Sequence, residues 1–255
     1  MDGALAAEAR ALLASARAWL AELVEEGVDA FPRVASPAAS ASEAPPAAWL
    51  APAPPLERAA APGPPAERPS LAQVRERLGE CTRCRLCEAR TQIVFGDGDP
   101  QAALMFIGEG PGETEDRRGL PFVGRAGELL TQMIEKGLGI PRRDVYICNI
   151  VKCRPPGNRT PLGDEVASCR PFLDGQIDAV QPRVIVALGK PAASLLLGRD
   201  VAITRARGTW HAYRGIPVMP TFHPAFVLRQ YTEENRRLVW SDLKAALERS
   251  RQQAR

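Results

Sequence analysis

The segment Ala103-Leu-Met-Phe-Ile-Gly-Glu-Gly-Pro-Gly112 decides the fold class, because a compact apolar run ends abruptly in a glycine-rich turn. Continuous apolar residues over 103–107 are typical of a strand that is buried on both faces, as in a parallel sheet. Runs of similar character occur at 145–148, 183–188 and 216–221. We therefore expect four buried strands.

Helical segments alternate with these strands along the chain. They are expected at 70–78, 126–136, 164–180, 191–197 and 235–250. This alternation predicts a three-layer α/β/α sandwich, in which helices cover both faces of a mostly parallel central sheet of about four strands. Ligands of such sheets bind at the carboxyl ends of the strands.

Three of the four expected strands end in residues that a simple connection does not need. They are the turn at 108–112, Asn149 and the pair His223-Pro224. Glu109 lies inside the turn, and because a carboxylate repels phosphate, a nucleotide cradle is disfavoured. An acid beside backbone N–H donors suits activation of water and binding of an oxyanion. A solvated acidic loop is the alternative interpretation.

Composition divides the chain into three parts. Residues 1–30 have the apolar spacing of one amphipathic helix, which could bind a protein partner. Residues 31–70 contain 11 prolines and 13 alanines, and this composition predicts a disordered Pro/Ala-rich linker. Residues 71–255 form the expected domain. The first 70 residues carry a net charge of −4, which leaves +7 on the body of the chain, and a basic body suits a polyanionic partner.

Membrane and secreted proteins are disfavoured. Hydrophobic residues make up 45% and charged residues 25% of the chain, and no apolar run approaches the roughly 20 residues that span a bilayer. The first ten residues include the acids Asp2 and Glu8 and do not have the order of a secretory signal. We expect a cytoplasmic protein of the bacterial cytosol or nucleoid.

Six cysteines indicate metal or redox chemistry in a reducing compartment. Cys81 and Cys84 have C-x-x-C spacing, and Cys153 and Cys169 flank a later loop rich in proline and glycine. Four thiolates suit either zinc or an iron–sulfur cluster, and the spacing does not choose between them. Free buried thiols are the remaining alternative.

Five motifs in order resemble the family 4 (type-4) uracil-DNA glycosylases of thermophilic bacteria and archaea. They are Cys81-Thr-Arg-Cys84-Arg-Leu, Gly108-Glu-Gly-Pro-Gly-Glu-Thr-Glu-Asp116, Gly119-Leu-Pro-Phe-Val-Gly-Arg-Ala-Gly127, Asn149-Ile-Val-Lys-Cys-Arg-Pro-Pro-Gly-Asn158 and Phe222-His-Pro-Ala225. The match covers about residues 71–249. The resemblance implies an enzyme that removes uracil from single- or double-stranded DNA, and we expect a monomer.

The resemblance also implies a [4Fe-4S] cluster rather than zinc. Its ligands would be Cys81, Cys84, Cys153 and Cys169. Cys87 and Cys148 are left out, because the family pattern needs no cysteine there, and Cys148 is expected to be a small buried apolar residue.

The uracil site implied by the resemblance matches the chemistry of the base, which must first be flipped out of the helix. Phe122 offers a flat face for stacking. Asn149 carries a donor beside an acceptor, which suits O4 and N3–H of uracil and not the edge of cytosine. His223 would donate to the charge that develops on uracil O2, together with backbone N–H groups of the Glu109–Gly110 turn. Pro111, in the same turn, is a further candidate contact to the base.

Glu109 and Glu115 are the candidates to orient the attacking water and to offset the positive charge of the sugar. The family lacks the aspartate that other uracil glycosylases have in this turn. Glu115 has a second candidate role, in which it crowds C5 of the base and excludes the methyl group of thymine.

Basic residues are the candidate contacts to DNA phosphates. They are Arg125, Lys152, Arg154, Arg159, Arg205, Arg207 and Arg229. Phe226 or Leu228 is a candidate wedge for the gap that the flipped base leaves. His211, which has no such context, is expected at the surface.

Three alternatives compete with this function. The first is a related glycosylase of broader substrate range, or one that traps DNA covalently, although the loop at 154–160 has no histidine for the covalent reaction. The second is a non-catalytic iron–sulfur module that binds DNA. The third is a zinc hydrolase, which two isolated histidines disfavour.

Overall fold

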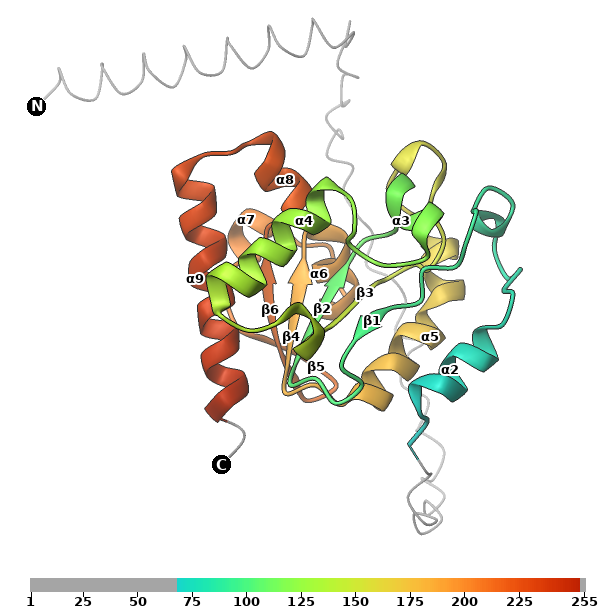
Figure 1. Ribbon diagram of the computed structural model, residues 1–255, viewed down its shortest axis with the longest axis horizontal. Coiled ribbons are helices and arrows are strands. Elements are labelled where there is room, and N and C mark those ends of the chain that lie inside the picture. The colour runs from blue at the N-terminus through green and yellow to red at the C-terminus, as the bar shows by residue number, and fades with distance from the viewer. Residues whose placement is uncertain (1–67, 253–255) are drawn as a thin grey trace, which may run out of the picture. The chain divides into compact units, whose positions relative to one another are not determined.

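A six-stranded sheet forms the centre of the computed structural model, which describes residues 68–252 (Figure 1). In spatial order its strands are β1 (Asp97–Gly98), β3 (Tyr146–Asn149), β2 (Leu104–Gly108), β4 (Val184–Leu188), β6 (Ile216–Thr221) and β5 (His211–Tyr213). The four central strands are parallel, and both edge strands pair antiparallel to their neighbours. The four expected strands are therefore confirmed, and the two edge strands were missed.

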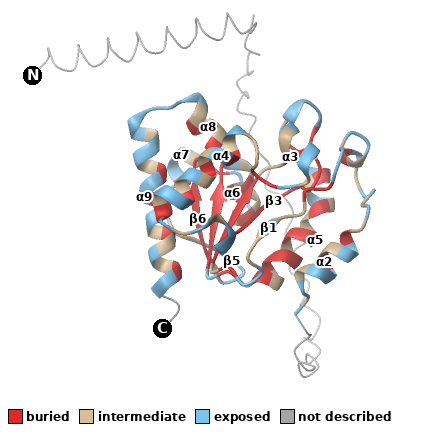
Figure 2. Ribbon diagram, viewed as in Figure 1, coloured by how far each residue is buried: buried red, intermediate tan, exposed pale blue. Residues whose placement is uncertain are grey.

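Helices cover both faces of the sheet, so the three-layer sandwich is confirmed. Side chains alternate along β2: Met105 and Ile107 belong to one apolar cluster, and Leu104 and Phe106 to another. The first cluster includes residues of α5 (Gly163–Val180) and α6 (Lys190–Leu197), and α2 (Leu71–Leu78) packs on α5. The second includes residues of α4 (Arg125–Gln132), its π-helical continuation (Met133–Leu138), α8 (Pro224–Arg229) and α9 (Glu233–Gln252). Figure 2 shows the buried residues gathered along the strands between these layers.

Local sequence explains where the principal helices begin and end. Ser70 caps α2, because its hydroxyl accepts from the backbone N–H of Gln73 while the Gln73 side chain accepts from the Ser70 N–H. The π-helical turn after α4 ends at Gly139, which has a φ of 68°. The fold also contains two short α-helices, α3 (Glu113–Arg118) and α7 (Ile203–Ala206). The acidic segment after the glycine-rich turn is thus the helix α3 rather than an open loop.

The predicted helix at 1–30 and all but the last three residues of the predicted linker at 31–70 lie outside the described residues, so both stay predictions. Within residues 68–252, no helix has the length and apolar character needed to cross a membrane.

Candidate functional site

A cavity of about 470 Å³ opens at the carboxyl ends of the central strands. Its walls include every residue that the sequence suggested for base binding and catalysis: Glu109, Gly110, Pro111, Glu115, Phe122, Asn149 and His223. These residues come from the ends of β2, β3 and β6, from helix α3 and from the segment before α4. The sheet therefore brings together in one cavity side chains that are more than a hundred residues apart in the sequence.

The side chain of Asn149 is buried at the end of β3 with neither polar atom paired. The residue is 1% exposed, and neither Oδ1 nor Nδ2 has a hydrogen-bond partner among the described residues. A buried amide without partners is costly, so such a group in a cavity wall indicates a ligand that supplies them. Its donor and acceptor are both available to a bound molecule.

Phe122 is held in a strained turn whose anchor is Glu115. The φ angle of Phe122 is +52°, in the left-handed region that bulky residues avoid. Oε1 of Glu115 accepts hydrogen bonds from the backbone N–H groups of Val123, at 2.8 Å, and Gly124, at 2.7 Å. The guanidinium of Arg142 donates to the carbonyl of Pro121 at 2.7 Å. The carboxylate and the guanidinium together fix the turn that presents the aromatic ring.

His223 is a neutral imidazole with a defined tautomer. It caps α8, and its Nδ1 accepts from the backbone N–H of Ala225 at 3.1 Å. Burial, helped by the charge of Arg229 and opposed by that of Glu115, lowers the pKa of His223 to about 4. With Nδ1 acting as an acceptor, the proton of the neutral ring lies on Nε2. The ring centre lies 5.6 Å from that of Phe122.

Glu109 is the less restrained of the two acids. Its backbone carbonyl accepts from the N–H of Val151 at 3.3 Å, which ties the glycine-rich turn to the segment after β3. Among residues 68–252, no hydrogen bond or ion pair holds its carboxylate, whereas Glu115 already accepts two backbone hydrogen bonds. Glu109 therefore has the carboxylate that is free to bind a water molecule.

The four cysteines that were expected to act together do line one pocket. Cys81 and Cys84 follow α2, Cys153 follows β3 and Cys169 lies on α5. Arg83 donates to the sulfur of Cys81, and Arg90 to the sulfur of Cys153, each at 3.3 Å.

The four thiols of this pocket are partly or fully buried. Burial raises the pKa of the Cys169 thiol to about 11 and also raises the pKa values of Cys84 and Cys153. Cys87 does not line the pocket, and Cys148 is buried in β3, as expected. In the described part of the chain, no three His, Cys, Asp or Glu side chains are grouped as ligands of a single metal ion.

Comparison with known proteins agrees with the motifs. A family model described as the uracil DNA glycosylase superfamily matches residues 95–244. The type-4 uracil-DNA glycosylase of Thermotoga maritima is 50% identical over 177 residues, which cover 68% of this chain and 91% of that protein. The type-4 enzyme of Sulfurisphaera tokodaii is 44% identical over 183 residues, covering 69% and 82%, and that of Archaeoglobus fulgidus is 39% identical over 183 residues, covering 69% and 90%.

This chain belongs to the type-4 uracil-DNA glycosylases. The resemblance drawn from the five motifs is thereby confirmed. The described residues include the whole of the matched region, 95–244.

Two of the basic residues expected to contact DNA in this type-4 glycosylase are wrongly predicted. Lys152 is 1% exposed, and its ammonium donates to the backbone carbonyl of Asn149 and to Gln176. Arg207 is paired with Asp242 and donates to the carbonyl of Leu238 at 3.0 Å. Both charged groups already form hydrogen bonds or an ion pair within the protein, so they are not available to bind a DNA phosphate.

The other expected phosphate contacts remain accessible. Arg125, Arg205 and Arg229 are exposed, and Arg229 lines the cavity. Arg159 also lines it, held by a bidentate pair with the buried Glu165 at 2.7 and 2.9 Å. The Nε of Arg154 donates to Asn158 at 2.9 Å.

The remaining expectations have mixed outcomes. Phe226 is half-buried against Phe222, with ring centres 4.8 Å apart, and Leu228 is also half-buried, so neither is a fully exposed wedge.

The expected surface position of His211 is wrong, since the residue is half-buried on β5 and its Nε2 is buried without a partner among the described residues.

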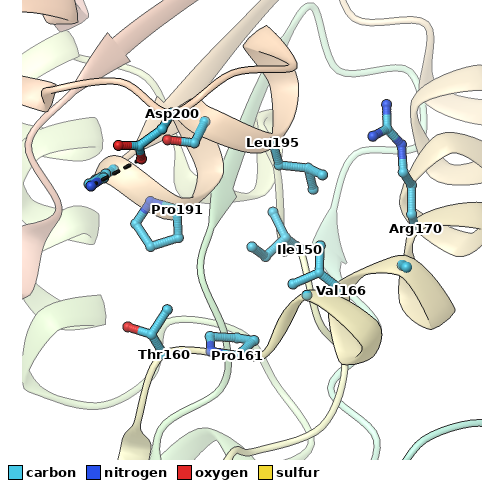
Figure 3. A pocket seen from close by; sticks show the side chains of 12 residues that line it. Ile150, Thr160, Pro161, Val166, Arg170, Pro191, Leu195 and Asp200 are labelled. Carbon is cyan, nitrogen blue, oxygen red and sulfur yellow. Dashed lines mark ion pairs between the residues drawn. The ribbon is translucent and has the colours of Figure 1, made fainter. Parts of the chain in front are cut away.

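The sequence analysis did not foresee a second cavity, nor two of the residues that line the base-binding cavity. A second cavity of about 640 Å³ lies between α5 and α6, with mostly apolar walls that include Ile150 and Leu195. Figure 3 shows these two side chains among those that line it. Thr160 and Pro161 line both cavities. None of the acids or histidines expected to act in catalysis lies in this second cavity. The Pro/Gly-rich composition of the loop was the one signal that could have singled out Thr160 and Pro161.

Proposed function

We propose that this chain removes uracil from DNA by hydrolysing the N-glycosidic bond, which leaves an abasic site for base-excision repair. The observation that carries the proposal is the buried amide of Asn149, which has no hydrogen-bond partner among residues 68–252 and lies in the same cavity as His223. The activity named for the type-4 relatives supports the same function.

Base recognition follows from the donor–acceptor pattern. The enzyme extrudes the nucleotide from the stack, at a cost of about a few kcal/mol. Phe122 stacks on the base, and the Asn149 side chain donates to O4 and accepts from N3–H. Cytosine carries a donor and an acceptor in the opposite places, so both hydrogen bonds become repulsive contacts.

Departure of the base requires a donor for the charge on uracil O2. The neutral ring of His223 donates its Nε2–H, and because its pKa is about 4, the imidazole serves as a hydrogen-bond donor rather than as a source of a proton. Backbone N–H groups of Glu109, Gly110 and the neighbouring turn add to the stabilisation. The charge stays on the leaving pyrimidine.

Water attacks the sugar as the bond breaks. The Glu109 carboxylate is the group that orients this water and offsets the positive charge of the sugar, since no other described side chain forms a hydrogen bond or an ion pair with it. Glu115 acts chiefly through Phe122, whose turn its carboxylate holds. Its second oxygen faces the region of Gly112 and is available to crowd the C5 position of the base.

Cys81, Cys84, Cys153 and Cys169 are the residues that would hold a [4Fe-4S] cluster. When bound, the cluster supplies iron–thiolate bonds that cross-link the turn after α2, the segment after β3 and helix α5. Arg83 and Arg90 donate to two of these sulfurs and offset the thiolate charge. The role of the cluster in this proposal is structural.

DNA binding would use the accessible cations around the cavity, namely Arg125, Arg154, Arg159 and Arg229. We further propose a monomer that acts in the cytoplasm, on single- or double-stranded DNA. A protein partner of the N-terminal segment stays a prediction.

The decisive test is incubation of the purified, iron-replete protein with an oligonucleotide that contains one uracil, followed by alkaline cleavage. We expect a break at the uracil position and none in a uracil-free control. Asn149→Asp should weaken the selection of uracil over cytosine. An iron-replete protein that leaves uracil-containing strands intact would refute the proposed activity.

A further inference from the structure

A lysine is buried between the base-binding cavity and the cysteine pocket. Lys152 lies just after β3 and is 1% exposed. Its ammonium donates to the backbone carbonyl of Asn149 at 2.6 Å and to Oε1 of Gln176 at 2.5 Å. Among residues 68–252, no carboxylate forms an ion pair with it. A buried ammonium without a counter-ion is unfavourable, so neutral acceptors must hold it closely.

Gln176 fixes the far side of this ammonium. Its side chain is fully buried on α5, and its Nε2 donates to the carbonyl of Phe95 and to the hydroxyl of Tyr146, each at 2.9 Å. Because these two acceptors occupy the amide nitrogen, the amide oxygen is oriented toward Lys152. Tyr146 is the first residue of β3 and Asn149 is the last. The network therefore connects both ends of the strand to one helix.

Lys152 also belongs to the wall of the cysteine pocket. It precedes Cys153 in the chain and lines the pocket together with Cys153 and Cys169. Its own carbonyl accepts from the N–H of Val94 at 2.8 Å. Only three residues separate Asn149 from Cys153 in the chain, and Lys152 is one of them.

We propose that Lys152 is a positioning residue for base recognition: it holds the backbone carbonyl of Asn149, and Gln176 orients it. This inference rests on the proposed function. Among the described residues, the Asn149 side chain has no hydrogen-bond partner, so its orientation depends on how firmly its own backbone is held. The alternative role for Lys152 is to offset thiolate charge alone, and the two roles predict different kinetics.

Lys152→Met tests the role, because methionine is unbranched and fills the apolar part of the same space. For the iron-loaded variant, we expect the single-turnover rate at saturating uracil-containing DNA to fall about tenfold or more, as for a lost hydrogen bond from a charged donor. The KM for DNA should stay within about twofold, because no DNA contact is removed. Inhibition by free uracil should weaken in parallel with the rate. Lys244→Met is the matched control, since Lys244 is exposed on α9 and stacks near Trp240.

A double-mutant cycle separates positioning from general stability. In an Asn149→Ala background, Lys152→Met should cause little further loss of rate, since the side chain that it positions is gone. Gln176→Met removes the second anchor without touching Asn149 or a residue next to a cysteine. It should show the same loss of rate with an unchanged KM, and it decides the question if Lys152→Met does not fold.

Three results would overturn the inference. They are a wild-type rate in the iron-loaded variants, a loss of rate that only follows the loss of iron per chain, and additive losses in the double-mutant cycle. If the wild-type protein itself does not excise uracil, the proposed function fails. If the wild-type protein is active and the variants match it per loaded chain, this inference alone fails.

Discussion

Gly108 and Asn149 are register partners across β2 and β3, and a Cβ atom built on Gly108 would lie 2.5 Å from Oδ1 of Asn149. The same atom would also collide with the ring of Phe122. The missing side chain at Gly108 is therefore what allows the amide and the aromatic ring to approach each other in the cavity. A glycine here is required by the close approach of two side chains, not by its own backbone angles.

Gly108→Ala should abolish most of the activity while the sheet stays folded. The added methyl group must displace the Asn149 amide or the Phe122 ring, and a displacement of about 1 Å at a reacting geometry can cost about a hundredfold in rate. Single-turnover excision of uracil is the measurement. Gly163→Ala is the control, because within residues 68–252 no atom beyond its chain neighbours and the backbone of its own helix lies within 4 Å of the Cβ position there. Equal rates for the two variants would contradict this account of the cavity.

Glu115→Gln and Glu115→Ala should differ. The amide of glutamine retains an oxygen that can accept from Val123 and Gly124, so the turn that strains Phe122 should persist. Alanine removes that acceptor, and relaxation of a strained backbone conformation worth about 1–3 kcal/mol would follow. We expect Glu115→Ala to lose about tenfold more rate than Glu115→Gln.

The same pair of variants tests the other roles of Glu115. Equal losses in both would assign the effect to the carboxylate charge rather than to the turn. A gain in thymine release by Glu115→Ala, measured on a thymine-containing strand, would favour steric exclusion of the methyl group at C5.

His223 should make the protein less stable in acid. Burial lowers the pKa of His223 to about 4 in the folded state, whereas the unfolded chain takes up this proton near pH 6.5. The unfolded state thus binds more protons, and stability falls as the pH decreases from about 6.5 to about 4, by up to about 3 kcal/mol. Above that window this residue adds no pH dependence.

Denaturant unfolding of wild-type and His223→Gln protein at pH 7.5 and pH 4.5 checks this effect. The variant should lose less stability between the two conditions. Arg159 lowers the pKa of Glu165 in the folded protein, so the unfolded chain takes up this proton first and stability also falls slightly near pH 4.5. Both proteins share that contribution. An equal loss in both would show that the buried imidazole does not titrate as expected.

Cys153→Ser should lose iron and visible colour, and its melting temperature should fall. Removing one of the four proposed ligands leaves three thiols in a pocket that joins three segments of the chain, and metal-bound ligands contribute directly to folding. Cys87→Ser is the matched control, since Cys87 does not line the pocket. Iron per chain, visible absorption and thermal unfolding are the measurements. Loss of iron in the control but not in Cys153→Ser would reverse the ligand assignment.

Local sequence patterns predicted most of the architecture. Runs of apolar residues indicate buried strands, because consecutive residues of a strand point to opposite faces of the sheet and both faces are covered by helices. The four central strands, the helices α2, α4, α5, α6 and α9, and the polar residues at the strand ends were therefore foreseen, whereas the short helices α3, α7 and α8 were not. The edge strands β1 and β5 were not, because they have two and three residues and exist only through pairing with a neighbour.

Only the tertiary structure determined which charged residues are buried, which partners they have, and which residue is held in a strained turn. Lys152 and Arg207 look like surface cations in the sequence, yet Gln176 on α5 and Asp242 on α9 bury them. Glu115 could be recognised as a site residue, but its two hydrogen bonds to the turn of Phe122 could not. The physical reason is that hydrophobic periodicity can be recognised from neighbouring residues in the sequence. The partner of a buried charge comes instead from a distant segment, and the two meet only when the layers pack together.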